Sequence, residues 1–219
     1  LAKLLGQAVT VENKPGGSGV IAVQAVRQAP ADGHTILMGS NSPAVVNAIT
    51  IKNLPYDPFK DLRPLYGLAI SPVAFAVRAD SPYKTINDVV AAAKKDGKPL
   101  QLGNYSAGYQ LVAAWLGGAS GLPVTHIPYK GGAQMLTDVI GGALDVGVID
   151  FTGTIELLKG GKLRVLAITS AQRDPGFPTI PTMKESGFAD FETAVWSAFF
   201  MRADTPDDVV EKLAAAIQK

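Results

Sequence analysis

The stretch Leu100–Asp150, LQLGNYSAGYQLVAAWLGGASGLPVTHIPYKGGAQMLTDVIGGALDVGVID, decides the fold class of this chain. It contains three short apolar strand candidates, Leu100–Gly103, Thr125–Pro128 and Val146–Ile149, and the segments between them have the pattern of helices. Strands that alternate with helices in this way form parallel sheets whose faces the helices cover. The sequence therefore predicts an α/β protein.

The same alternation continues outward from this stretch. Further strands are predicted at Val9–Glu12, Thr35–Gly39, Val73–Arg78, Leu163–Thr169 and Val195–Met201. Helix starts are predicted at Thr85–Asp88 and at Thr205–Asp208, where Thr205 is the expected N-cap and Pro206 the first helical residue. Leu1–Gly6 has the pattern of the end of a helix, and Asn53–Asp61, with two prolines, that of a surface connection.

Composition excludes several classes of function. The 219 residues are 47% hydrophobic, which is enough to bury one large domain or two smaller lobes. Twenty basic and nineteen acidic residues leave a net charge of +1 without a charge run, so nucleic acid is not an expected partner. The absence of cysteine excludes disulfides and thiolate chemistry.

Motifs for catalysis and for cofactors are weak. Gly17–Ala22 matches the glycine spacing of a dinucleotide-binding turn, but several loop residues separate it from the preceding strand, so an ordinary loop-to-helix turn is favoured. Gly103–Gly108 has P-loop spacing but lacks the lysine and hydroxyl residue that contact phosphate and Mg²⁺. With only two histidines and no metal-binding spacing, we expect no enzyme activity, no cofactor and no metal.

Polar loops after predicted strands are the candidate ligand site. The segment around Ser106 offers a hydroxyl and the amide groups of a helix N-terminus, which together favour an anion. The loops at Ser40–Ser42, Tyr129–Lys130 and Asp150–Phe151 also follow strands, and open α/β sheets bind ligands at the carboxyl ends of their strands. We therefore expect capture of a small organic acid.

Five strings of residues, spread over almost the whole chain, resemble one protein family. They are Val11–Gly17 (VENKPGG), Asn53–Pro58 (NLPYDP) with Lys60 and Asp61, His126–Gly131 (HIPYKG), Leu136–Asp138 (LTD) with Gly141, Gly142 and Asp145, and Asp204–Pro206 (DTP). Together they resemble the substrate-binding component of tripartite tricarboxylate transporters, the Bug family of periplasmic binding proteins.

This resemblance implies a type II periplasmic-binding-protein fold, with two α/β lobes that close on a carboxylate. Lobe I would be 1–78 with 200–219, lobe II would be 79–199, and Val73–Arg78 and Trp196–Met201 would cross between them. The implied protein is a periplasmic monomer that delivers a mono- or dicarboxylate, or an amino acid, to membrane permease subunits. The implied ligand-binding residues are Ser40, Asn41, Ser42, Tyr105, Ser106, Ala107, Gly108, Tyr109, Gln110, Tyr129, Lys130, Asp150 and Phe151.

The chain departs from the family pattern at both ends and in one loop. It starts inside the helix after the family's first strand and stops before the family's last helix, so parts of lobe I are expected to be missing. The run Tyr105–Tyr109 replaces the more usual glycines and serines, which favours a narrower pocket or one that accepts aromatic groups.

Two points stay open at this level. Asp150 would suit a ligand amine in relatives that bind amino acids, or it would bond water or backbone beside a plain dicarboxylate. The ligand-sensing domain of a transcriptional regulator, which has the same two-lobed fold, is the alternative function.

Overall fold

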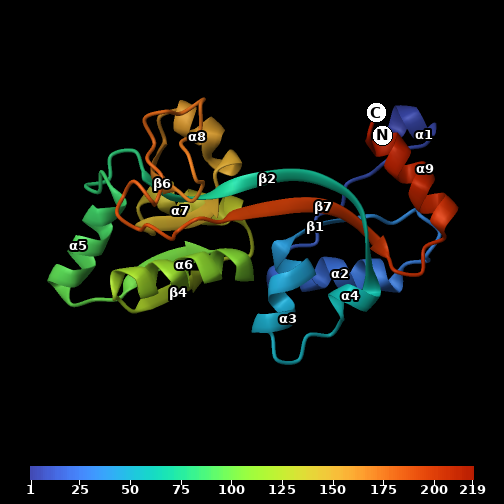
Figure 1. Cartoon of the computed structure of the whole chain (residues 1–219), viewed down its shortest axis with the longest axis horizontal. Helices are drawn as coiled ribbons and strands as arrows, with labels where there is room; N and C mark the ends of the chain where they lie inside the picture. Colours follow the sequence, from blue (N-terminus) through green and yellow to red (C-terminus); the bar gives the residue numbers. More distant parts are fainter. The chain divides into compact units, whose positions relative to one another are not determined.

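The computed structural model describes all of residues 1–219, and the chain folds into two compact units. Unit 1 consists of Leu1–Ala69 and Trp196–Lys219, and unit 2 is Ile70–Val195. The chain passes between the units within two long strands, β2 (Leu62–Arg78) and β7 (Ala194–Arg202) (Figure 1). The bounds of these units differ from the predicted lobes, 1–78 with 200–219 and 79–199, and the assignment of lobes stays a prediction.

The sheet of unit 2 is mixed. Besides the end of β2 it contains β3 (Leu100–Asn104), β4 (Val124–Pro128), β5 (Val146–Asp150) and β6 (Leu163–Ile168), in the order β6-β2-β5-β3-β4. The three strands β4, β3 and β5 are parallel, as the sequence predicts, whereas β2 pairs antiparallel with both β5 and β6. In the first of these antiparallel pairs Val73 lies opposite Asp150.

The helices of unit 2 begin and end at recognisable signals. They are α5 (Ile86–Asp96), α6 (Ala107–Ser120), α7 (Gly132–Gly141), the short turn η3 (Thr152–Thr154) and α8 (Ile155–Lys159). The N-terminus of α5 is a capping box between Thr85 and Asp88, as the sequence predicts. Both α5 and α6 end at a glycine in the left-handed conformation, Gly97 and Gly121, which closes the last turn without strain.

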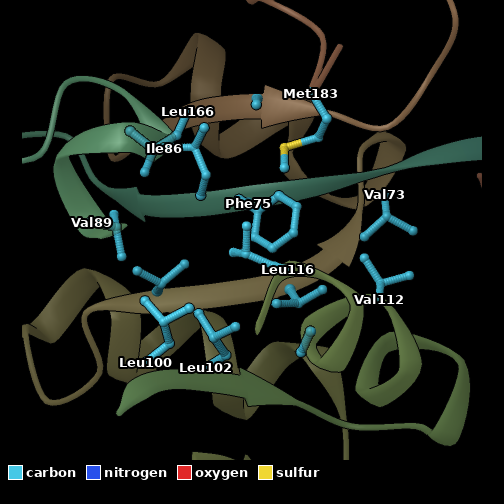
Figure 2. Packing of buried hydrophobic residues seen from close by; sticks show 14 of the residues in the cluster. Val73, Phe75, Ile86, Val89, Leu100, Leu102, Val112, Leu116, Leu166 and Met183 are labelled. Carbon is cyan, nitrogen blue, oxygen red and sulfur yellow. The ribbon is translucent and has the colours of Figure 1, made fainter. Parts of the chain in front are cut away.

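The core of unit 2 lies between its sheet and its helices. Figure 2 shows the ring of Phe75 from β2 inside this core, with Leu116 from α6 beside it. Phe75 also contacts the ring of Phe191 edge to face, with 6.2 Å between the ring centroids. Each of these side chains is almost completely buried, which stabilises the fold by about 1.5–3 kcal/mol per residue.

Unit 1 contains an antiparallel strand pair. Strand β1 (Leu37–Ser40) pairs with β7, and its helices are α1 (Ala2–Leu5), η1 (Gly17–Gly19), α2 (Val20–Gln28), η2 (Ser42–Val46), α3 (Asn47–Thr50), α4 (Pro58–Asp61) and α9 (Asp207–Ile217). Its main apolar cluster joins Val23 and Val26 of α2 to Phe200 of β7. Gly17–Ala22 forms a loop-to-helix turn, with Ser18 at φ 53°. None of the helices in either unit combines the length and the apolarity needed to cross a lipid bilayer.

Three local predictions are wrong. Val9–Glu12 is not a strand: it has no partner strand, and Val11 is 88% exposed. Helix α9 begins at Asp207 rather than Pro206, because Pro206 has an extended backbone (ψ 145°) and takes the N-cap position instead of Thr205. Asn53–Asp61 is not only a surface connection, since it buries Tyr56 and ends in α4.

Candidate functional site

The carboxyl ends of β3 and β5 bring together a cluster of polar side chains in unit 2. Because the two strands are parallel neighbours, Asp150 at the end of β5 lies close to the loop that follows β3. Tyr105 is in this loop, and Tyr109 follows in the first turn of α6. Their rings pack with 4.8 Å between centroids.

Asp150 accepts four hydrogen bonds from its own protein. Its Oδ1 accepts from the hydroxyls of Tyr105 and Tyr109, at 3.0 and 3.1 Å. Its Oδ2 accepts from the hydroxyl of Thr152 at 2.9 Å and from the backbone N–H of Gly153 at 2.8 Å. The carboxylate therefore connects the loop after β3, the helix α6 and the loop after β5, and we call these five residues the Asp150 network.

The two tyrosines are held in their neutral form. Burial is the main cause that raises the pKa of both hydroxyls above the ordinary value of 10.0. The nearby charge of Asp150 raises both pKa values further, because a phenolate there would be repelled. Both hydroxyls therefore remain protonated, and able to donate a hydrogen bond, at neutral pH.

The network extends to β2. The Ser71 Oγ accepts from the backbone N–H of Thr152 at 3.3 Å and lies 3.4 Å from the Thr152 hydroxyl. Sequence reasoning missed Ser71, and it included Thr152 and Gly153 only as part of the polar loop after β5, not as site residues. The hydroxyls of Thr152 and its neighbours after β5 were a usable signal, but Ser71 reaches the site only through the antiparallel pairing of β2 with β5.

The remaining residues predicted at α6 surround its N-terminus. Ser106 is the N-cap, and its side chain makes no capping bond, although its carbonyl accepts from the N–H of Gln110 at 3.0 Å. Ala107 and Gly108 are buried in the first turn, and Gln110 is exposed. The structure thus places 105–110 at one end of a 14-residue helix, where the helix dipole favours negative charge.

Tyr129 and Lys130 lie at the end of the adjacent strand β4, outside the Asp150 network. The Tyr129 hydroxyl donates to Asp138 on α7 at 2.9 Å rather than to Asp150. Lys130 is exposed and forms no ion pair. The predicted ligand contacts of both residues stay predictions.

Phe151 differs from the other predicted site residues because its side chain lies in the core. It is 1% exposed and packs edge to face on Phe177, with 5.4 Å between the ring centroids. The buried Phe151 side chain anchors the loop after β5 to the core. Its burial indicates a packing role, and the predicted ligand contact of Phe151 stays a prediction.

Ser40, Asn41 and Ser42 belong to unit 1, at the end of β1 and the start of η2. A small buried network holds this loop: Asn47 donates to the Tyr56 hydroxyl at 3.1 Å, and Tyr56 donates to the carbonyl of Pro43 at 2.7 Å. The ligand role of the three loop residues stays a prediction.

A hollow of about 430 Å³ on unit 1 involves none of the predicted site residues. Its lining consists of Gln24, Arg27, Gln28, Lys60, Asp61, Arg202, Ala203 and Asp204. The two arginines in it are already paired, Arg27 with Asp61 at 3.0 Å and Arg202 with Asp204 at 2.6 Å. The charges of this hollow are used for internal contacts.

Comparison with known proteins places the whole chain in one group. The model of the tripartite tricarboxylate transporter family receptor matches residues 1–219. The chain is 35% identical over 213 residues to a UPF0065 protein of Bordetella bronchiseptica, with 97% of this chain and 63% of that protein covered. A UPF0065 protein of a Pseudomonas species is 32% identical, with 100% of this chain and 66% of the relative covered. The chain thus spans about two thirds of the length of these relatives.

Solved structures agree with this group and with a periplasmic-binding-protein fold. The chain is similar to a Rhodopseudomonas palustris protein described with adipate (TM-score 0.92, 30% identity, 99% of this chain and 73% of that one). It is also similar to the R. palustris protein MatC described with bound malate (TM-score 0.91, 27% identity, 99% and 74%). The periplasmic binding protein BugD matches with a TM-score of 0.88 at 32% identity, over 99% of this chain and 73% of that one.

Proposed function

This chain belongs to the tripartite tricarboxylate transporter receptor family, and from that premise we propose that it is a solute-binding receptor for a small organic carboxylate. The proposed place of action is the periplasm, and the proposed destination of the ligand is a set of membrane permease subunits. The family and the fold are those of substrate-binding receptors, and no chemical change of the ligand is part of the proposal.

The observation that carries this proposal is the match of the entire chain to the receptor family, joined to the likeness to proteins described with adipate and malate. Both of those compounds are dicarboxylates. The N-terminus of α6 suits such a ligand, because the helix dipole there favours negative charge and the Ser106 side chain makes no capping bond.

We place one ligand carboxylate at the N-terminus of α6, near Ser106. The Ser106 hydroxyl makes no capping bond, and the helix behind it is long enough to present a full dipole. Lys130 supplies an unpaired cation after the adjacent strand. Ser40–Ser42 of unit 1 remain predicted ligand contacts.

The energies involved are sufficient for this mode of binding. A hydrogen bond to a charged group contributes about 1.5–3 kcal/mol, and micromolar affinity requires about 8 kcal/mol. Three or four such bonds, with burial of the ligand's methylene groups, therefore account for micromolar binding without an arginine.

The first test is a thermal-shift screen of the purified chain against mono-, di- and tricarboxylates, followed by calorimetric titration of the compounds that stabilise it. A ligand that binds only the folded state at one hundred times its Kd adds about 2.7 kcal/mol of stability. We expect at least one dicarboxylate to do so. Failure of every carboxylate to shift the melting temperature would contradict the proposed function.

The second test locates the site with two serines of one helix. Ser106 occupies the N-cap position of α6, and Ser120 is the last residue of that helix. The Ser120 hydroxyl donates to the Gly117 carbonyl at 3.2 Å. We expect Ser106→Ala to weaken carboxylate binding about tenfold, which corresponds to about 1.4 kcal/mol. Ser120→Ala is the matched control and is expected to leave the affinity unchanged. Equal affinities for the two variants would remove Ser106 from the site.

A further inference from the structure

Asp150 has no acceptor position left for a ligand. An ionised carboxylate has two oxygens with about four lone-pair sites. In this structure four donors occupy them: the hydroxyls of Tyr105, Tyr109 and Thr152 and the N–H of Gly153, all at 2.8–3.1 Å. The carboxylate is therefore fully satisfied by its own protein.

A ligand ammonium group would have to displace one of these donors. Displacing Tyr109 from Oδ1 leaves its hydroxyl without an acceptor in a residue that is 7% exposed. At Oδ2 an ammonium group would compete with Thr152 and Gly153, which are exposed but already donate at 2.9 and 2.8 Å. An unsatisfied buried donor costs more free energy than an ordinary hydrogen bond returns. The ammonium group would also lose its own hydration without gaining a free acceptor.

The tyrosines cannot relieve this conflict by ionising or by turning away. Burial and the Asp150 charge keep both hydroxyls protonated. The ring of Tyr105 also packs against the start of α7, where a Cβ on Gly132 would lie 3.1 Å from the ring. The Tyr105 ring is thus held in place, and its hydroxyl lies 3.2 Å from the Tyr109 hydroxyl, so both hydroxyls stay within the network.

Building on the proposed function, we infer that the Asp150 network is a specificity element that selects carboxylates without an amino group over the corresponding amino acids. In this arrangement Asp150 orders the loops around the ligand and does not bind an ammonium group. Under this inference Asp150 takes the second of the two roles left open above, a bond to the backbone rather than to a ligand amine.

The test compares ligand pairs that differ only by one amino group: succinate with aspartate, glutarate with glutamate, and adipate with 2-aminoadipate. In calorimetric titrations of the unmodified chain, we expect the compound without the amine to bind at least about tenfold more tightly in the pair that fits best. An aminated compound that binds equally well or better would overturn the inference. If no compound of either kind binds, the proposed function fails as well, and the two failures are thus distinguished.

Variants that free one acceptor position on Asp150 test whether the occupied carboxylate is the cause of the preference for amine-free ligands. Tyr105→Phe removes one donor to Oδ1, and we expect it to reduce the preference for the amine-free compound at least threefold. Tyr83→Phe removes a hydroxyl elsewhere in unit 2 and should leave the preference unchanged. Should Tyr105→Phe fail to fold, Thr152→Val removes a donor from the exposed side of the same carboxylate and carries the same expectation. An unchanged preference in a folded variant of this kind would overturn the inference.

Discussion

Replacing Asp150 with asparagine tests how strongly the network holds the loops of unit 2 together. The substitution keeps the size and shape of the side chain but exchanges one acceptor oxygen for an NH₂ group that only donates. Asp150 receives two donors on each oxygen. In either orientation of the asparagine amide, its NH₂ group therefore faces two of the four donors, either the two tyrosine hydroxyls or Thr152 and Gly153.

The favoured orientation follows from burial. Thr152 and Gly153 are exposed, so water can replace the lost acceptor there, whereas Tyr109 is buried and needs the remaining oxygen. The two tyrosine bonds then change from charged to neutral, at about 1 kcal/mol each, and the Gly153 bond is lost at about 1 kcal/mol. We therefore expect the free energy of unfolding of unit 2 to fall by about 2–4 kcal/mol, a large share of the 5–15 kcal/mol typical of a domain.

The two tryptophans allow this loss to be assigned to unit 2. Trp115 belongs to unit 2 and stacks on Phe191 at 4.5 Å, while Trp196 belongs to unit 1. In a Trp196→Phe background, urea unfolding followed by fluorescence reports on unit 2 alone. Asp138→Asn is the control. The Asp138 side chain accepts a single hydrogen bond, from Tyr129, so this substitution should cost about 1 kcal/mol or less. A change below about 0.5 kcal/mol for Asp150→Asn would refute the reasoning.

Three further predictions concern unit 2. A Cβ on Gly103 would lie 2.2 Å from the side chain of Leu144, so Gly103→Ala should lower the free energy of unfolding by about 1–3 kcal/mol. Gly118 lies in open space on α6, so Gly118→Ala should leave the free energy of unfolding unchanged or raise it by up to about 1 kcal/mol. Equal effects of the two substitutions in urea unfolding would contradict this prediction. Burial lowers the pKa of His126 below 6.5 in the folded chain, so as the pH falls the unfolded chain binds a proton at this histidine before the folded chain does. The contribution of His126 to the free energy of unfolding should therefore be full above about pH 6.5 and decrease below it. His126→Gln should flatten this decrease, and an identical pH profile for the variant would contradict the assignment. Thr85→Ala removes the cap of α5 and should lower the melting temperature, at a cost of about 1 kcal/mol, and an unchanged midpoint would argue against the capping box.

The sequence predicted most secondary-structure elements because their signals are local. Seven of the eight strand predictions overlap observed strands, as the apolar runs of β3, β5 and β6 need only their own residues to be recognised. The capping box at Thr85 and the glycine after α1 are equally local. Val9–Glu12 fails for the complementary reason: its residues suit a strand, but a strand exists only where a partner supplies the ladder bonds, and none does here.

The candidate site was predicted in part. The position of Tyr105, Tyr109 and Asp150 near one another follows from the rule that parallel strands end at one edge of the sheet. The sequence did not show that both tyrosine hydroxyls donate to the same carboxylate oxygen, or that the Tyr129 hydroxyl turns toward Asp138 instead. Side-chain directions at this level depend on packing from several elements at once.

The order of strands and helices, the helix caps and the polar loops after strands were therefore determined by the sequence alone, because each depends on residues within a few positions of one another. The membership of the Asp150 network was decided only by the tertiary structure. Tyr105 and Asp150 are far apart in the chain, and Ser71 approaches Thr152 only because β2 runs antiparallel to β5. A hydrogen bond selects its partners by distance and direction in space, and these are fixed only when the sheet has formed.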